Sequence, residues 1–138
     1  MKTRQNTNPE PRSDFIGTEK ALGFFPGSLS QNKSPGGFHV IYVVATLMIK
    51  PETHAEFIAA ATACIKETRK EPGNIAYDLH ESVTDHSKMV FVEQWENSEA
   101  LVPHRSAEHM KTFGRVVVKC LASPPKIEII TPEKVDVR

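Results

Sequence analysis

The chain has 138 residues, of which 39% are hydrophobic and 25% charged, a composition typical of one soluble domain with a hydrophobic core. Seventeen basic residues balance seventeen acidic ones, so charge gives no reason to expect nucleic acid or an anionic membrane as a partner. No apolar run approaches the roughly 20 residues that span a bilayer, and no apolar stretch of a secretory signal follows Lys2 and Arg4, so we expect a cytoplasmic protein.

The composition changes near residue 38. Residues 1–38 are rich in Pro, Asn, Ser and Gly and show no sustained periodicity, as in segments that bury little surface. An apolar patch at residues 21–29 (ALGFFPGSL) is the exception. We predict a folded domain over residues 39–138, preceded by an N-terminal arm. The arm is either flexible or docked, as a strap across a partner subunit or as a lid over a pocket.

The first predicted elements are a strand and a helix. Residues 40–49 form a continuous run of β-branched and apolar residues with apolar side chains on both alternating faces, which predicts a strand covered on both sides. Pro51 suits the first turn of a helix, and residues 71–74 (EPGN) form the turn that ends it. Cys64 falls on the apolar stripe of this helix and Cys120 on that of a later one, which favours two buried free thiols over a catalytic pair. The helix stripe consists of Phe57, Ile58, Ala61, Cys64 and Ile65.

A β-hairpin is predicted next. Residues 75–81 form its first strand and residues 88–96 its second, joined by a loop at residues 84–87. Strict alternation places three apolar side chains of the first strand on one face, namely Ile75, Tyr77 and Leu79.

Two helices and a last strand complete the predicted domain. Ser98 is expected to cap a short helix that runs through Leu101, and Pro103 is expected to interrupt it. Ser106 is expected to cap a longer helix, and residues 127–131 form the last strand. The core face of the longer helix carries Met110, Phe113, Val117 and Leu121.

The resulting order is β-α-β-β-α-β, which predicts an α+β, ferredoxin-like fold with a four-stranded antiparallel sheet and helices on one face. Two helices cannot cover both faces of such a sheet. The doubly apolar first strand therefore predicts a homodimer whose subunits pack sheet to sheet as a dimeric α/β-barrel.

Glu93 is the first candidate for acid/base chemistry. It shares one face of its strand with Met89, Phe91 and Trp95. A carboxylate between a phenyl ring and an indole is costly to bury unless it is protonated or paired. Burial raises the pKa of such a carboxyl group, as suits a general acid or base. The structural alternative is a Glu93 held by backbone N–H groups or by an arginine, for example Arg105 or Arg115.

Two histidines follow. His109 is expected in the first turn of a helix, where the helix dipole favours a neutral imidazole that can accept a proton. His104 follows Pro103 and is expected at a break between helices, turned inward. A capping, solvent-exposed or merely structural role is the alternative for each. With Glu93 they could form the facial triad of a non-heme iron site, but their five-residue spacing across a helix break argues against a metal. No flavin, nicotinamide or nucleotide motif is present in the sequence, so no cofactor is expected.

The segment VEQWENSEAL at residues 92–101, followed by His104 and by AEHMK at residues 107–111, resembles the signature of the antibiotic-biosynthesis monooxygenase domain. The turn at residues 71–74 followed by Tyr77 is similar to that family's entry into its second strand. The resemblance covers residues 41–132. It implies a dimer of ferredoxin-like subunits, in agreement with the strand faces.

The resemblance is strongest to the quinol monooxygenase-like branch. Members of this family that oxidise quinols and anthrones need no cofactor, because the deprotonated substrate itself reduces O2. We therefore expect a cofactor-independent monooxygenase of a quinol- or anthrone-like aromatic, with His104 or His109 as base and Glu93 as its partner. The residues expected to contact the substrate are Trp95, Tyr77, Asn74, Phe91 and Phe113.

Two alternatives remain open at this point. One is an isomerase of a small phosphorylated dione, and the other is a non-catalytic dimer that binds a small molecule. The heme-degrading branch of the family is a poorer match. Its members carry Trp at the position of His104, His at that of Gly114 and Asn at about that of Val44. We therefore expect no heme binding.

Overall fold

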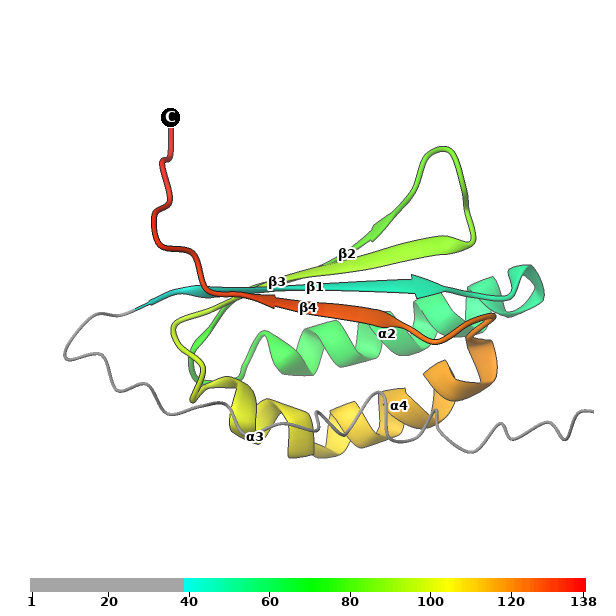
Figure 1. The fold of residues 1–138 in the computed structure, drawn as a ribbon. Helices are drawn as coiled ribbons and strands as arrows, with labels where there is room; N and C mark the ends of the chain where they lie inside the picture. Colours follow the sequence, from blue (N-terminus) through cyan, green and yellow to red (C-terminus); the bar gives the residue numbers. More distant parts are fainter. Residues whose placement is uncertain (1–38) are drawn as a thin grey trace, which may run out of the picture.

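The computed structural model describes residues 39–138, so the predicted arm and its apolar patch at residues 21–29 lie outside the described residues. Residues 39–138 adopt a ferredoxin-like fold, a four-stranded antiparallel sheet with helices on one face (Figure 1). The strand order is β2-β3-β1-β4. The strands are β1 (Ile41–Met48), β2 (Asn74–Glu81), β3 (Lys88–Trp95) and β4 (Lys126–Ile130).

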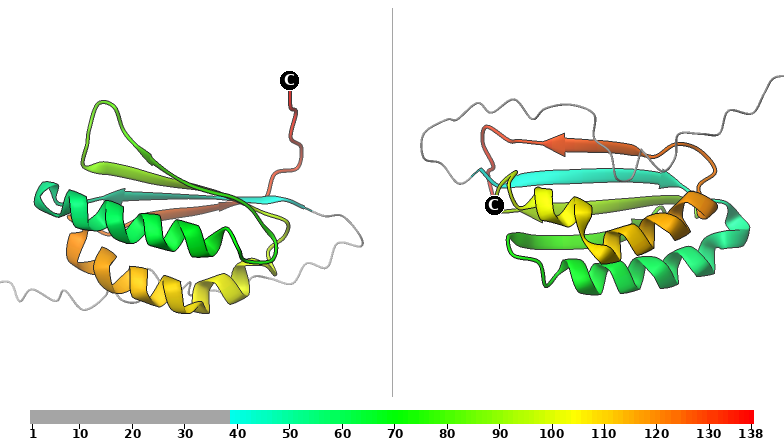
Figure 2. Two further views of the ribbon diagram at one scale, coloured as in Figure 1. Left: turned by 180° about the vertical axis from the view of Figure 1, so that it is seen from behind. Right: turned by 90° about the horizontal axis from the view of Figure 1, so that it is seen from below.

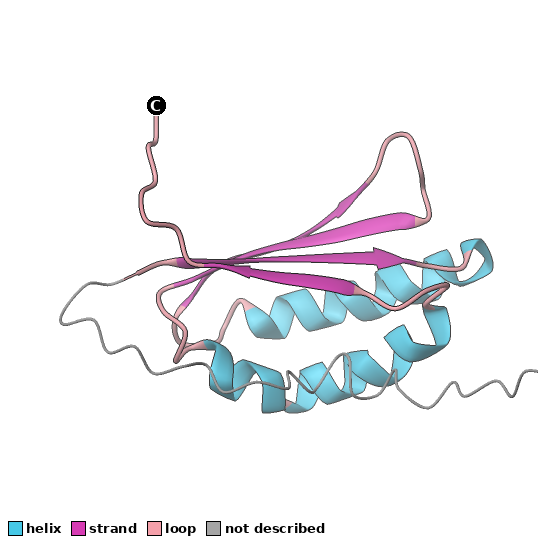
Figure 3. Cartoon of the chain, viewed as in Figure 1, coloured by secondary structure: helices cyan, strands magenta, loops and turns pink. Residues whose placement is uncertain are grey.

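The helices lie together against one face of the sheet, and the other face carries none (Figures 2 and 3). None of the helices in residues 39–138 has the length and hydropathy needed to cross a membrane. They are the 3-10 helix η1 (Pro51–Thr53), α2 (His54–Thr68), α3 (Leu101–Ser106) and α4 (Glu108–Cys120).

The hydrophobic core lies between the inner face of the sheet and the helices. Side chains of β1 alternate along the strand between buried and half-buried, so within residues 39–138 only one of its two faces is fully covered. The inner side chains of the sheet pack with Phe57 of α2 and with Phe113 and Val117 of α4. Both cysteines are free and buried in this core, as predicted. The outer side chains of β1 are only half-buried, namely Tyr42, Val44, Thr46 and Met48.

The predicted helix boundaries between β3 and α4 are wrong. Helix α3 begins at Leu101, so Pro103 lies in its first turn, where a missing backbone N–H costs no hydrogen bond. Pro103 therefore does not interrupt a helix. Ser98 is not the N-cap of α3, because that position is occupied by Ala100. Ser106 does not cap α4 either. Its hydroxyl donates a hydrogen bond to the carbonyl of Pro103, and the extended residue Ala107 makes the break between α3 and α4.

A bulge near the start of β2 changes which side chains face inward. Asn74 pairs with Trp95 and Ala76 with Gln94, so Ile75 is an extra residue in the ladder. Ile75 is 50% exposed, and the prediction that it shares a face with Tyr77 is wrong. The same bulge brings Tyr77 to the inner face, where it is buried.

The turn between α2 and β2 depends on Gly73. This residue has a φ of 83°, and a Cβ added to it would lie 2.6 Å from the Cβ of Ala100. We expect Gly73→Ala to lower the free energy of unfolding by about 2–4 kcal/mol, because left-handed backbone strain and overpacking add. Denaturant unfolding measures the change. The control is Gly114→Ala in α4, where an added Cβ meets nothing within 4 Å. It should stabilise by about 0.5–1 kcal/mol. Equal effects of the two substitutions would contradict the prediction.

Candidate active site

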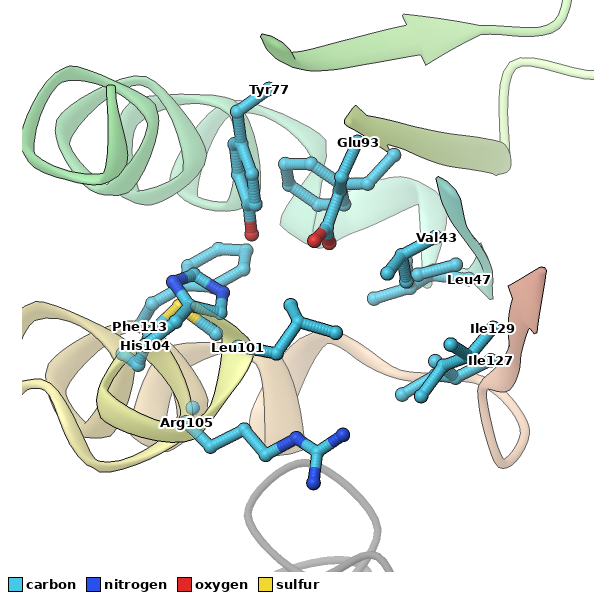
Figure 4. A pocket seen from close by; sticks show the side chains of 14 residues that line it. Val43, Leu47, Tyr77, Glu93, Leu101, His104, Arg105, Phe113, Ile127 and Ile129 are labelled. Atoms are coloured by element: carbon cyan, nitrogen blue, oxygen red, sulfur yellow. The ribbon is translucent and has the colours of Figure 1, made fainter. Parts of the chain in front are cut away.

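A cavity lies between the inner face of the sheet and helices α3 and α4 (Figure 4). Its walls are mostly aliphatic and aromatic, and Glu93, His104, Arg105 and the hydroxyl of Tyr77 are the polar exceptions. Such a site, apolar with a few converging polar groups, is typical of small-molecule binding. Its lining residues are Val43, Ala45, Leu47, Tyr77, Phe91, Glu93, Leu101, His104, Arg105, Met110, Phe113, Gly114, Ile127 and Ile129.

Glu93 is a buried carboxyl group in the sheet wall of this cavity. It lies in the middle of the sheet, between Val43 of β1 and Tyr77 of β2, and is 6% exposed. The indole Nε1–H of Trp95 donates a hydrogen bond of 2.8 Å to its Oε2. Burial raises the pKa of Glu93 to about 7; the Trp95 hydrogen bond opposes this rise and the negative charge of Glu71 adds to it. Glu93 can therefore gain or lose a proton near neutral pH.

Tyr77 contributes a neutral hydroxyl to the cavity. In Figure 4 its hydroxyl, the Glu93 carboxyl and the His104 ring face a common space. Burial, followed by the charge of Glu93, raises the pKa of Tyr77 well above its ordinary value, so the phenol keeps its proton as a donor. Burial also raises the pKa of the nearby Cys64 thiol to about 11, which makes this cysteine a poor nucleophile.

His104 shares a carboxylate with His109. His104 Nδ1 lies 2.8 Å from Oε1 of Glu71, and His109 Nε2 lies 2.7 Å from the same oxygen. Glu71 follows α2, while the histidines belong to α3 and to the first turn of α4. The Thr68 hydroxyl lies 3.2 Å from His109 Nε2. Burial lowers the pKa of His104 despite the opposing hydrogen bond with Glu71, so this imidazole is neutral at pH 7.

Three side chains that could bind a metal ion lie together, but the distances between their ligand atoms are those of hydrogen bonds. Glu71, His104 and His109 each offer one ligand atom, and these atoms lie within 4.8 Å of one another. Around a tetrahedral ion with ligands at about 2.0–2.1 Å, neighbouring ligand atoms are about 3.3 Å apart. The contacts of 2.7 and 2.8 Å are shorter and match charge-assisted hydrogen bonds. The carboxylate beside the histidines is Glu71, whereas the iron-site alternative considered from the sequence used Glu93.

Five of the eight predicted site residues line the cavity: Glu93, His104, Tyr77, Phe91 and Phe113. Trp95 lies behind the wall, fully buried, with its ring centroid 4.7 Å from that of His104. His109 also lies outside the lining, and it contacts Glu71, which in turn contacts His104 in the wall. Asn74 takes no part in the cavity, and its side-chain amide donates to the carbonyl of Ala76.

Glu71 is the residue that the sequence did not reveal as part of the site. It was identified only as the start of a turn, because it lies 33 and 38 residues from the two histidines it contacts. The one available signal was topological. The turn that enters β2 meets the end of its partner β3, and the Glu96 N–H donates to the carbonyl of Gly73 there. The predicted position of His104 at a helix break is also wrong, since it lies within α3.

Neither arginine proposed as a partner of Glu93 is seen to hold it. The hydrogen-bond donor to the Glu93 carboxyl is the indole N–H of Trp95. Arg105 extends away from Glu93 at the edge of the cavity (Figure 4). Arg115 is exposed on α4. Arg105 therefore supplies positive charge at one end of the cavity, while the acid/base groups lie at the other.

Comparison with known proteins gives one consistent family. Residues 40–116 match the family model of antibiotic biosynthesis monooxygenase. "Putative monooxygenase Rv0793" of Mycobacterium tuberculosis is 30% identical over 92 residues, which cover 67% of this chain and 90% of that protein. "Putative monooxygenase YcnE" of Bacillus subtilis is 31% identical over 85 residues, covering 62% and 90%. An uncharacterised protein of Synechocystis is 34% identical over 64% of this chain, but the match spans only 60% of that relative.

Solved structures agree with these matches. The structure of Rv0793 from Mycobacterium tuberculosis superposes with a TM-score of 0.66 and 28% identity, covering 71% of this chain and 99% of that one. A conserved protein from Methanosarcina mazei gives a TM-score of 0.67 at 28% identity, covering 70% and 95%.

Proposed function

The chain belongs to the antibiotic biosynthesis monooxygenase family, and from this membership we propose that it is a cofactor-independent monooxygenase of a quinol- or anthrone-like aromatic. The observation that carries the proposal is a neutral imidazole, His104, in the wall of a mostly apolar cavity. Glu93 and the Tyr77 hydroxyl face the same space. An aromatic hydroxyl compound matches this cavity, with its rings against the apolar walls and its hydroxyl against the polar groups.

In the proposed reaction the protein removes one proton and lets the substrate reduce O2. His104 takes the hydroxyl proton, and the apolar walls raise the energy of the resulting anion by excluding water. The Tyr77 hydroxyl donates to the developing oxyanion. The anion passes an electron to O2, and the two radicals combine at a ring carbon to give a peroxide. The His104 imidazolium returns its proton to the peroxide, and loss of water, which also takes the hydrogen of that ring carbon, leaves a carbonyl. One oxygen atom of O2 therefore enters the product and the other leaves as water.

A second candidate function is supported by Arg105. An isomerase of a phosphorylated dione needs an acid/base pair for enolisation and a cation for the phosphate. Glu93 and His104 would supply the pair, and Arg105 lies in the wall of the same cavity. The apolar character of the remaining wall favours the aromatic substrate, so the isomerase is ranked second.

Oxygen uptake tests the proposal. A panel of reduced quinols and anthrones is incubated with the protein, with no added cofactor and with a chelator, and spontaneous oxidation is subtracted. Uptake above background, with one oxygen atom from 18O2 in the product, is the expected result. No uptake with any compound would overturn the monooxygenase. Proton exchange of phosphorylated diones in D2O would then identify the isomerase. Thermal stabilisation by the compounds without turnover would instead identify a binding protein.

We also propose that two copies pack together through the outer face of the sheet. Within residues 39–138 the helices cover only the inner face (Figure 1). The outer face carries a cluster of apolar side chains at neighbouring register positions. Val92 is 37% and Ile130 45% exposed, and Tyr42 and Val44 beside them are half-buried. An exposed apolar surface of this kind on a pleated sheet is typical of sheet-to-sheet association.

Val92→Asp tests this interface. We expect light scattering to show a dimer for the unmodified protein, and the substitution to weaken association by about 100-fold or more, because an unpaired buried charge costs about 3–5 kcal/mol. The control is Val83→Asp in the hairpin loop, where the valine is 91% exposed and association should not change. A dimer that survives Val92→Asp at low micromolar concentration would rule out this interface.

A further inference from the structure

Glu71 holds the histidine of the cavity although it does not itself line the cavity. Its side chain is 13% exposed, and one of its oxygens, Oε1, contacts both imidazoles. The contact distances are 2.8 Å to His104 Nδ1 and 2.7 Å to His109 Nε2. The carboxylate therefore joins the turn after α2 to two helices that follow β3. This connection is made through Oε1 alone.

The other ring nitrogen of His104 faces the cavity. Nδ1 and Nε2 point away from each other across an imidazole ring, so Nε2 is directed away from Glu71. The side-chain hydrogen bond of His104 involves Nδ1. Within residues 39–138 no buried side-chain nitrogen or oxygen lacks a hydrogen-bond partner, so Nε2 must be accessible rather than sealed in the core. Since the ring is 4% exposed and lines the cavity, that accessible space is the cavity.

The chemistry of the carboxylate decides where the proton of His104 lies. An ionised carboxylate can only accept hydrogen bonds, so the nitrogen 2.8 Å from it must carry a hydrogen. A neutral imidazole has a single N–H, and His104 is neutral at pH 7. With the hydrogen on Nδ1, the lone pair is on Nε2, in the cavity.

We propose that Glu71 is a positioning residue that keeps the proton of His104 on Nδ1 and thereby presents Nε2 to the substrate as the base. This inference rests on the proposed function, since a base is needed only if the cavity performs proton transfer. It also assigns different roles to the two histidines. Nε2 of His109 is occupied by Glu71, so His109 anchors the carboxylate while His104 accepts the substrate proton. After proton transfer, the charge of Glu71 stabilises the His104 imidazolium.

The groups around His104 support this assignment. The Tyr77 ring lies edge-on at 5.5 Å between centroids, and Trp95 lies at 4.7 Å. The titratable groups that face it are Tyr77 from β2, Glu93 from β3, Arg105 from α3 and His109 from α4, with Glu71 from the turn. Among these, only Glu71 forms a hydrogen bond with the His104 ring. Within residues 39–138, Glu71 is thus the carboxylate that is hydrogen-bonded to this ring.

Nitrogen NMR tests the inference without any substrate. Histidine ring nitrogens are labelled with 15N in the unmodified protein, in Glu71→Gln and in the control Glu67→Gln, and His104→Ala assigns the signal. We expect His104 to carry its proton on Nδ1 in the unmodified protein and in Glu67→Gln. In Glu71→Gln the amide can also donate to Nδ1, so a substantial share of the Nε2–H tautomer is expected. Glu67 is a suitable control because it is exposed near the same end of α2 and pairs with Lys70.

The kinetic expectation for Glu71→Gln is a kcat lower by about 10²–10⁴-fold with KM nearly unchanged, as for other histidine bases whose carboxylate partner is neutralised. Glu71→Asp, which keeps the charge, should recover part of the rate. An Nε2–H tautomer in the unmodified protein overturns the inference, and so does a tautomer unaffected by Glu71→Gln. The first of these results does not depend on whether Glu71→Gln folds. The NMR experiment could show the expected tautomers while no substrate supports oxygen uptake. That combination would refute the proposed monooxygenase and leave the positioning role of Glu71 intact.

Discussion

Replacing His104 with alanine is expected to lower kcat for oxygen uptake by about 10²–10⁴-fold, the usual contribution of a positioned general base. The His104 imidazole lies in the cavity wall and is neutral at pH 7, so it can accept the hydroxyl proton of the substrate. Without it, the hydroxyl proton must pass to Glu93, which is itself partly protonated near neutral pH, or to water, which the apolar walls exclude. Steady-state oxygen consumption at saturating substrate measures the loss, after subtraction of spontaneous oxidation.

The controls for this substitution separate catalysis from folding. His104 is buried, so its removal also takes a hydrogen-bond donor from Glu71 and is expected to destabilise the fold by about 1–3 kcal/mol. His104→Asn retains an amide donor that can reach towards Glu71 but has no base, so it should be equally inactive and more stable. His86→Ala removes an exposed histidine of the hairpin loop and should leave activity unchanged. Wild-type turnover in both His104 variants would remove His104 from the mechanism.

Replacing Glu93 with glutamine is expected to stabilise the protein at alkaline pH by roughly 2–3 kcal/mol. The folded protein raises the pKa of this carboxyl from 4.5 to about 7, mainly through burial. A raised pKa means that its contribution to stability is fully present below pH 4.5 and is lost as the pH rises through 7. Glutamine has the same shape, can accept the Trp95 indole N–H and does not ionise, so its stability should not fall over this range.

Urea unfolding at pH 5 and pH 8.5 checks this expectation. At pH 5 the two proteins should differ by less than about 1 kcal/mol, because Glu93 is then mostly protonated in the folded state. Glu96→Gln, at an exposed position just after β3, is the control and should show no pH-dependent difference. A gain of equal size at both pH values would show that ionisation of Glu93 is not its cause. A carboxyl that destabilises the fold at working pH is typical of a group retained for function.

The strands and the α2 helix could be predicted because their signals are local. The continuous run of β-branched and apolar residues located β1 within one residue of each of its ends, and the three- and four-residue spacing located α2. The segment between β3 and α4 was harder, because the consequence of a proline depends on where its helix begins. A shift of that start to Leu101 places Pro103 in the first turn, where it is tolerated. The bulge at Ile75 left no signal either, since alternation alone assumes an unbroken ladder.

The candidate site could be predicted only for residues close together in the sequence. Glu93, His104 and Trp95 lie within twelve positions of one another and were identified together. Glu71 contributes through contacts that no spacing rule predicts, because the chain must first form α2, β2 and β3 before the turn meets α3. Residue type alone could not decide which carboxylate the histidines contact. The fold brings Glu71 to them and leaves Glu93 with the indole of Trp95.

The hydrogen bond between Glu71 and His104 also affects how the candidate site responds to heat and denaturant. Helix α3 has six residues, too few to be stable as an isolated helix, and it carries His104. Its place therefore depends on tertiary contacts, among them the buried Leu101 and the hydrogen bond to Glu71. Local opening of α3 would separate the imidazole from its carboxylate while the sheet and α2 stay folded. Heat or denaturant should thus inactivate the protein before global unfolding, and amide hydrogens of α3 should exchange ahead of those in β1 and β3.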